Sequence, residues 1–338
     1  SPIVAQLLLN RGITDQEDVT RFLEAKLTDL RPPEELPGLP AAVERIMKAI
    51  SGKEEIVVYG DYDADGMTAT SILYRCLSLI GAKVIYHLPN RMEEGYGLHA
   101  EVVEKLQARG KQLIITVDCG IASILAAKRA HELGVSLVVT DHHRFAEELP
   151  VADAIVHPSL PGTNYPFPGL CGAGVAFKLA WALCQAHCGS PRVTDRLRDF
   201  LLQAVGLAAI ATVADVVPLL DENRVIVRSG LKTLRKHAPL GLQKLMKIAK
   251  LDEKEQLNSD DFGFSIAPRL NAAGRLGQAQ LGVELLITED EERAEALAPY
   301  IDELNGNRGK LERSIQLSAT KQLQEVHSPE EDPAFVLA

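Results

Sequence analysis

Five short runs of aliphatic and β-branched residues, separated by helical stretches, constrain the fold of this chain most strongly. They occupy residues 56–59, 84–86, 113–117, 136–140 and 154–156. The stretches near 68–80, 99–109 and 121–133 carry apolar residues at helical spacing. Apolar runs without polar alternation are typical of strands that are covered on both faces. The order of these elements therefore predicts an α/β fold in which βαβ units form a parallel sheet.

The rest of the chain is predicted to be largely helical. Short helical patterns fill residues 1–50, and residues 172–250 look mostly helical. The glycine-rich stretch 261–277 is expected to be irregular, and a further helix is expected over 290–326. We expect four parts: a helical leader (1–50), a central domain (51–300), a connecting helix (301–330) and the start of a further domain that is cut short (331–338).

Charge and cysteine content narrow the class of protein. The chain has 36 Lys and Arg against 46 Asp and Glu, a net charge of −10. This balance argues against a protein that coats nucleic acid with a uniformly basic surface, although it leaves room for a local basic cleft. The sequence contains no run of about 18 uncharged apolar residues, so a membrane span is not expected. The 5 cysteines have no framework spacing, which favours a reducing compartment, and we expect a cytoplasmic protein.

Acidic and imidazole side chains follow three of the predicted strands. They lie in Asp61–Asp65, at Asp118 and in Asp141–His143. The carboxyl ends of parallel strands share one edge of the sheet, where α/β proteins bind ligands. A single Asp after a strand is usually a turn residue or a helix cap, but three matching strand ends favour a metal. Carboxylates with some imidazole suit Mn²⁺ or Mg²⁺, and a bridging carboxylate could join two such ions.

These strings closely resemble motifs of the DHH phosphoesterase superfamily. The motifs are Gly60–Gly66 (GDYDADG), Thr116–Gly120 (TVDCG) and Thr140–His143 (TDHH). Further strings resemble its RecJ branch: Pro89–Arg91 (PNR), Gly95–Gly97 (GYG), Thr212–Pro218 (TVADVVP) and Ala267–Arg275 (APRLNAAGR). The resemblance covers nearly the whole chain and implies a DHH-type parallel-sheet domain. Proteins of that branch degrade single-stranded DNA from the 5′ end.

The resemblance also implies a set of metal ligands. Two Mn²⁺ or Mg²⁺ ions would be held by five residues, with Asp118 as the bridge: Asp61, Asp63, Asp118, His142 and Asp215. Asp215 follows an apolar helical stretch, where an unpaired carboxylate is costly to bury, although a buried ion pair would also satisfy it. Other members of the superfamily carry a His where this chain has Val57, so one ion is expected to have fewer protein ligands.

Further residues are expected to support the ligands or to contact the substrate. His143 is expected to act in catalysis by contacting the scissile phosphate or the attacking water. The residues expected to orient ligands from behind, or to cap helices, are Asp65, Asp141 and His157. The residues expected on the 5′ phosphate or the DNA backbone are Arg91, Arg269, Asn271, Arg275 and Arg308, each with a surface salt bridge as the alternative.

The segment 224–250 contains eight basic residues and no acidic ones. Arg224, Arg228 and Lys232 would share one helical face, which could follow a DNA backbone. A solvated face is the commoner explanation for such a run. The segment is the local exception to the acidic balance of the chain.

The expected function is a metal-dependent 5′ to 3′ exonuclease on single-stranded DNA that releases 5′ mononucleotides in DNA repair and recombination. Alternatives are a DHH phosphodiesterase on short oligonucleotides or cyclic dinucleotides, a manganese pyrophosphatase, and a RecJ-like replication scaffold without catalysis. The resemblance implies single-stranded DNA, single-strand-binding protein and a recombination helicase as partners of a monomer. Family members continue into a DHH-associated domain and an OB-fold, which we expect to follow these residues.

Overall fold

A parallel sheet lies at the centre of the fold. The computed structural model describes residues 1–91 and 93–326 and holds a five-stranded sheet in the order β2-β1-β3-β4-β5. The pairing is parallel throughout, so that Val57 lies beside Ile85 on one side and beside Ile114 on the other. The five predicted strands are confirmed as β1 (Glu55–Tyr59), β2 (Lys83–His87), β3 (Leu113–Val117), β4 (Ser136–Thr140) and β5 (Ala154–Val156).

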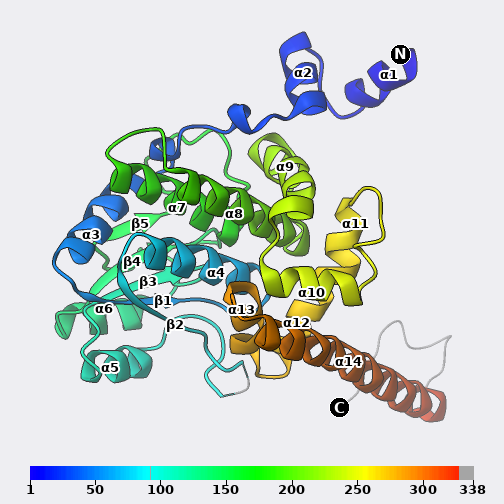
Figure 1. Cartoon of the computed structure of the whole chain (residues 1–338). Helices are drawn as coiled ribbons and strands as arrows, with labels where there is room; N and C mark the ends of the chain where they lie inside the picture. The colour runs from blue at the N-terminus through cyan, green and yellow to red at the C-terminus, as the bar shows by residue number, and fades with distance from the viewer. Residues whose placement is uncertain (92, 327–338) are drawn as a thin grey trace.

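Helices cover both faces of the sheet (Figure 1). On one face α5 (Ala100–Ala108) and α6 (Ile124–Glu132) bury Val57 and Ile114. The other face buries Val58 and Ile115 in a larger core. Because successive residues of a strand point to opposite faces, each strand serves both cores, which explains the continuous apolar runs. The helices on the larger side are α3 (Leu39–Ser51), α4 (Ala64–Leu79), α7 (Gly172–Cys188) and α8 (Asp195–Ala214).

The remaining elements lie at the two ends of the chain. The leader comprises α1 (Pro2–Leu9), α2 (Gln16–Glu24) and two short 3₁₀ turns, Leu27–Asp29 and Pro33–Glu35. After α8 come α9 (Asp221–His237), α10 (Leu240–Ile248), α11 (Ser259–Asp261), a π-helical turn η3 (Phe262–Ile266), α12 (Ala267–Arg275), α13 (Ala279–Ile287) and α14 (Glu291–Val326).

The predicted irregularity of residues 261–277 is wrong, because most of this stretch is helical. Its glycines serve close packing. A Cβ added at Gly274 would lie 1.8 Å from the carbonyl oxygen of Tyr62, so α12 sits directly on the chain that follows β1. Pro268 lies in the first turn of α12, where a missing N–H costs no hydrogen bond.

Two other expectations concern α8 and α14. Helix α8 is long and apolar enough to cross a membrane by composition alone, but 61% of that stretch is buried inside the protein, as in a core helix. The boundary expected at residue 301 falls inside α14, which runs without a break through the described residues. The further domain expected at 331–338 lies outside the described residues.

Candidate metal centre

Residues that follow β1, β3 and β4 meet at the carboxyl edge of the sheet. Tyr59 of β1 pairs with Thr116 of β3, and Val117 pairs with Thr140 of β4, so the chain leaves these strands at the same level. Asp118 adopts a left-handed backbone with φ of 60°, which few residues other than Gly, Asn and Asp accept readily. A residue other than Gly with a left-handed backbone at this edge is typical of functional sites.

The five ligands expected from the resemblance come together, with two neighbours. Ligand atoms within 4.8 Å of one another form three groups: Asp61, Asp63 and Asp118; Asp118, His142 and His143; and Asp65, His142 and Asp215. Asp118 belongs to two of the groups, as a bridging carboxylate would. Asp215 reaches the cluster from the end of α8, where its Oδ2 lies 3.7 Å from Nε2 of His142.

Three buried atoms of the cluster lack a hydrogen-bond partner among the described residues. They are Oδ1 of Asp61, Oδ1 of Asp118 and Nε2 of His142. Orphaned polar atoms of this kind are costly in a protein interior. All three are electron-pair donors toward a cation when the acids are ionised and the imidazole is neutral. The donor set therefore fits Mn²⁺ or Mg²⁺, which prefer carboxylate oxygen with some imidazole.

Burial without a cation disfavours the charged form of these acids. Burial and the neighbouring carboxylate of Asp63 raise the pKa of Asp61 to about 7. Burial also raises the pKa of Asp118 well above its usual range, with further contributions from Asp65 and Asp63. The pKa of Asp215 is raised by burial and by Asp65. The acids would lose their protons when a divalent ion binds, because the ion replaces the missing positive charge.

Asp65 and Asp141 support the cluster from behind. Asp65 accepts hydrogen bonds from the N–H groups of Gly172 (2.7 Å) and Ala173 (2.6 Å), so it receives the positive end of α7. Asp141 accepts from the N–H of Ile121 and from the two histidines that follow it. Burial alone would raise the pKa of Asp141, but these hydrogen bonds, chiefly that from the side chain of His143, lower it.

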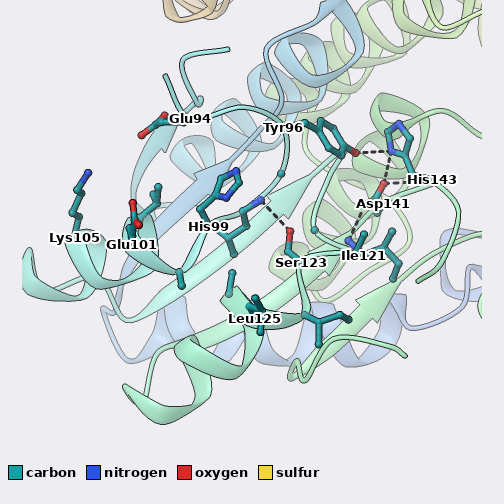
Figure 2. Close-up of a pocket in the computed structure, with 18 of the residues that line it drawn as sticks. Glu94, Tyr96, His99, Glu101, Lys105, Ile121, Ser123, Leu125, Asp141 and His143 are labelled. Carbon is teal, nitrogen blue, oxygen red and sulfur yellow. Dashed lines mark hydrogen bonds and ion pairs between the residues drawn. The ribbon is translucent and has the colours of Figure 1, made fainter. Parts of the chain in front are cut away.

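Two side chains meet one ring nitrogen of His143. Its Nδ1 lies 2.8 Å from Oδ1 of Asp141 and 3.0 Å from the hydroxyl of Tyr96 (Figure 2). Tyr96 also donates to the carbonyl oxygen of Asp118 at 3.3 Å, so it connects β3 to His143. The N–H of Ser159 donates to Nδ1 of His157, which leaves Nε2 of His157 to donate to the carbonyl oxygen of His143. Tyr96 was not among the predicted site residues, although its Gly-Tyr-Gly string was a signal for it.

The residues expected on the substrate phosphate are placed less uniformly. Arg91 lies over the ring of Tyr62, 5.2 Å from its centroid, and Arg275 is exposed at the end of α12. Arg269 is bound to Asp302 and to the carbonyl oxygen of Ser265, and Arg308 to Glu312. The expected phosphate contact of Asn271 stays a prediction for its Nδ2, because its Oδ1 accepts the N–H of Ala64 at 2.7 Å. That hydrogen bond supports the start of α4, directly after Asp63.

The basic face of α9 holds the leader. The guanidinium of Arg224 lies 3.6 Å from the centroid of the Phe22 ring and donates to the carbonyl oxygen of Phe22. Arg228 donates to the carbonyl oxygen of Leu23. These contacts give Arg224 and Arg228 partners in the leader, so the suggested use of this face to follow DNA stays a prediction, and Lys232 is exposed.

A large cavity adjoins the metal centre (Figure 2). It has a volume of about 1140 Å³, and its lining includes His143 of the cluster and Asp141, which supports the cluster. Tyr96, Ser123 and Leu125 belong to its walls, between the chain before α5 and the start of α6. The lining residues follow β2, β3 and β4, at the carboxyl edge of the sheet where open α/β sheets bind ligands.

Comparison with known proteins places these features in a family. Residues 55–209 match the DHH family, N-terminal domain. The chain is 47% identical to the single-stranded-DNA-specific exonuclease RecJ of Bacillus subtilis over 92% of its own length and 38% of that protein. It is 38% identical to the exonuclease of the same name from Escherichia coli, over 94% of this chain and 55% of that one. The chain thus spans about half the length, or less, of these curated relatives.

Solved structures agree with this placement. A crystal structure of exonuclease RecJ bound to manganese matches with a TM-score of 0.75 and 38% identity, covering 85% of this chain and 70% of that one. The Thermus thermophilus RecJ in complex with Mn²⁺ matches with a TM-score of 0.77 and 34% identity, over 96% of this chain and 44% of that one. Both proteins bind manganese.

Proposed function

Because this chain belongs to the DHH family, in its RecJ branch, we propose that it is the catalytic part of a metal-dependent exonuclease that degrades single-stranded DNA from the 5′ end. The observation that carries the proposal is the cluster around Asp118 and His142, whose buried donor atoms lack partners within the described residues. The products would be 5′ mononucleotides, released in DNA repair and recombination.

The proposed metal ligands are Asp61, Asp63, Asp118, His142 and Asp215, with Mn²⁺ or Mg²⁺ as the ions. The chemistry that a pair of such ions supplies is activation of a water molecule and neutralisation of charge on the phosphate. Asp118 and His142 each belong to two ligand groups, and of the two Asp118 would be the bridge because a carboxylate has two oxygens to offer. His143, held by Asp141 and Tyr96, would face the scissile phosphate or the attacking water. These residues would fix the geometry of an in-line attack.

Positive side chains would hold the DNA. Arg269 and Arg308 already have partners in the chain, so Arg91 and Arg275 are better placed to bind a phosphate. A guanidinium matches the geometry of phosphate oxygens. Three wider proposals rest on the resemblance. They are the partners, namely single-strand-binding protein and a recombination helicase, the monomeric state and the cytoplasmic location. The five free cysteines are compatible with a reducing cytoplasm.

The rival functions make different demands on the site. A non-catalytic scaffold has no need of the ligand set that this chain carries intact. A phosphodiesterase on short oligonucleotides or cyclic dinucleotides, or a manganese pyrophosphatase, could use the same cluster, but the relatives over 92% and 94% of this chain are named exonucleases on single-stranded DNA.

Digestion of end-labelled DNA tests the proposal. Single-stranded DNA labelled at the 5′ or the 3′ end is incubated with the chain and Mn²⁺, beside Asp118→Asn, since Asn tolerates the left-handed backbone of this position. We expect label to be released first from the 5′ end, and a loss of at least about 100-fold in the variant. Release from the 3′ end, equal cleavage of double-stranded DNA, or undiminished activity of Asp118→Asn would contradict it. A preference for dinucleotides or pyrophosphate would favour the rivals.

A further inference from the structure

A buried asparagine at the start of α9 joins two segments that both end at the metal centre. Asn223 is fully buried, and its Nδ2 donates to the carbonyl oxygens of Gly169 at 2.5 Å and Pro218 at 3.0 Å. Both N–H groups of the amide are therefore used. Its Oδ1 has no partner among the described residues, so the donor end is the part of this side chain that makes contacts.

The two carbonyls belong to the supports of different ligands. Gly169 lies three residues before Gly172, whose N–H binds Asp65 and whose backbone lies against Asp118. A Cβ added at Gly172 would be 2.4 Å from Oδ1 of Asp118, so the start of α7 packs directly against that carboxylate. Pro218 lies three residues after Asp215, whose carboxylate belongs to the same ligand group as Asp65. Asn223 thus connects the start of α7 to the segment that carries Asp215.

The connection between α8 and α9 is strained and needs such support. Val216, directly after Asp215, has φ of 59°, and Asp221 has φ of 45°. For a β-branched residue a left-handed backbone is a rare outlier, and it persists only where the surroundings enforce it. The hydrogen bond from Asn223 to Pro218 falls between these two residues. Of the two hydrogen bonds that Nδ2 of Asn223 donates, the one to Pro218 is made within the strained segment.

Asn223 is itself fixed by its neighbour. Glu222 is fully buried and forms an ion pair with Lys178 of α7. Its carboxylate also accepts the hydroxyl of Tyr165 and the N–H of Arg31. A buried ion pair with further hydrogen bonds allows little movement, because breaking it would leave charges uncompensated. The first turn of α9 is therefore anchored to α7 independently of Asn223.

We infer that Asn223 is a positioning residue for the metal centre, which it serves by holding Asp215 at a fixed distance from the α7 segment that supports Asp65 and Asp118. The inference rests on the proposed function, because it takes these three acids to be part of a divalent metal site. Within the described residues the hydrogen bonds of Asn223 go to backbone carbonyls and not to the acids. It therefore acts through the backbone of Gly169 and Pro218.

Mn²⁺ affinity of the full chain tests the inference. Asn223→Asp keeps the shape of the side chain but removes both donors, and Asn223→Ala removes the bridge without adding a charge. We expect Mn²⁺ to bind about 10-fold more weakly, or worse, in both variants, measured by calorimetry or by the electron paramagnetic resonance of free Mn²⁺. The matched control is Val227→Ala, a core truncation in the same helix, which should lower Tm without changing Mn²⁺ affinity.

The outcomes separate this inference from the proposed function. Wild-type affinity for Mn²⁺ in Asn223→Ala, or an equal loss of affinity in Val227→Ala at a similar drop in Tm, would overturn the positioning role. A wild-type chain that binds Mn²⁺ but leaves single-stranded DNA intact would contradict only the exonuclease proposal. A wild-type chain that does not bind Mn²⁺ would contradict both.

Discussion

Nε2 of His142 lies 3.1 Å from Oδ1 of Asp118, and neither atom has a hydrogen-bond partner among the described residues. Two buried electron-pair donors at this distance repel each other when Nε2 carries no proton and the carboxylate is ionised. A proton or a cation between them removes the repulsion. The stability of the metal-free chain should therefore depend on pH, and a bound metal ion should remove that dependence.

The metal-free chain is expected to lose stability as pH rises, because the pKa of Asp61 is about 7 in the folded chain against an ordinary value of 3.8. The folded state holds the proton more tightly, so this stabilisation is complete at low pH and disappears as pH rises toward 7. Asp61 alone should lower the free energy of unfolding by roughly 2 kcal/mol between pH 5 and pH 8. Urea unfolding in a chelator measures it.

Asp61→Asn is the control for that experiment, because an amide does not ionise. His143 has a raised pKa and His157 a lowered one, so their contributions oppose each other, whereas the raised pKa values of Asp118 and Asp215 act in the same direction as that of Asp61. All of these groups remain in the variant. A difference in unfolding free energy between wild type and Asp61→Asn that stays constant from pH 5 to pH 8 would refute the assignment. Adding Mn²⁺ at pH 8 should restore the stability of the wild type.

Gly172→Ala is expected to disturb the metal centre, because the added methyl would lie 2.4 Å from Oδ1 of Asp118. Mn²⁺ affinity should fall about 10-fold or more. Gly174→Ala, two residues further along α7, brings its methyl no closer than 3.4 Å to Leu170, so it should keep wild-type affinity. Because Ala has a higher helix propensity than Gly, Gly174→Ala should raise the free energy of unfolding by about 0.5–1 kcal/mol. Equal Mn²⁺ affinity in the two variants would show that the close approach has no role.

Replacement of Asn271 should distinguish support of the metal loop from phosphate binding. Asn271→Asp keeps the acceptor for the N–H of Ala64, whereas Asn271→Leu removes it. We expect near wild-type nuclease activity in Asn271→Asp and a loss of about 10-fold or more in Asn271→Leu. If Asn271 instead contacts a DNA phosphate, the carboxylate of Asn271→Asp would repel the substrate, and KM for DNA would rise in that variant.

Arg224→Ala should release the leader without weakening DNA binding. The guanidinium stacks on Phe22 and holds α2 against α9, so its loss should speed cleavage by trypsin within residues 1–25. Affinity for single-stranded DNA and its salt dependence should not change. Lys232→Ala, on the same face but exposed, is the control. A shallower salt dependence in both variants would instead assign this face to DNA.

The sheet could be predicted because buried parallel strands appear in a sequence as apolar runs. The three strand ends that carry ligands could be predicted because the residues that follow parallel strands share one edge of the sheet. Asp61, Asp118 and His142 follow from that rule. Asp215 does not, since it ends a helix, and only the family resemblance and the cost of burying its charge pointed to it. The structure brings it to the same cluster.

Contacts between distant parts of the chain could not be predicted. Asn271 binds a backbone group 207 positions earlier, and Asn223 joins two loops whose sequences show no sign of their closeness. The glycines of residues 261–277 were interpreted as breaks in helical structure, whereas Gly274 gives α12 room to lie on Tyr62. Glycine has both uses, and only the packing partner distinguishes them.

The hydrogen bond from Ala64 to Asn271 also orders events in folding. Contacts across 207 positions form late, because the entropy of closing so long a loop is lost before the contact contributes. The loop that carries Asp61 and Asp63 should therefore stay mobile in a partly folded chain until α12 docks on it. We expect refolding to be limited by this docking and to proceed at the same rate with or without Mn²⁺, with the ion captured only at the last step.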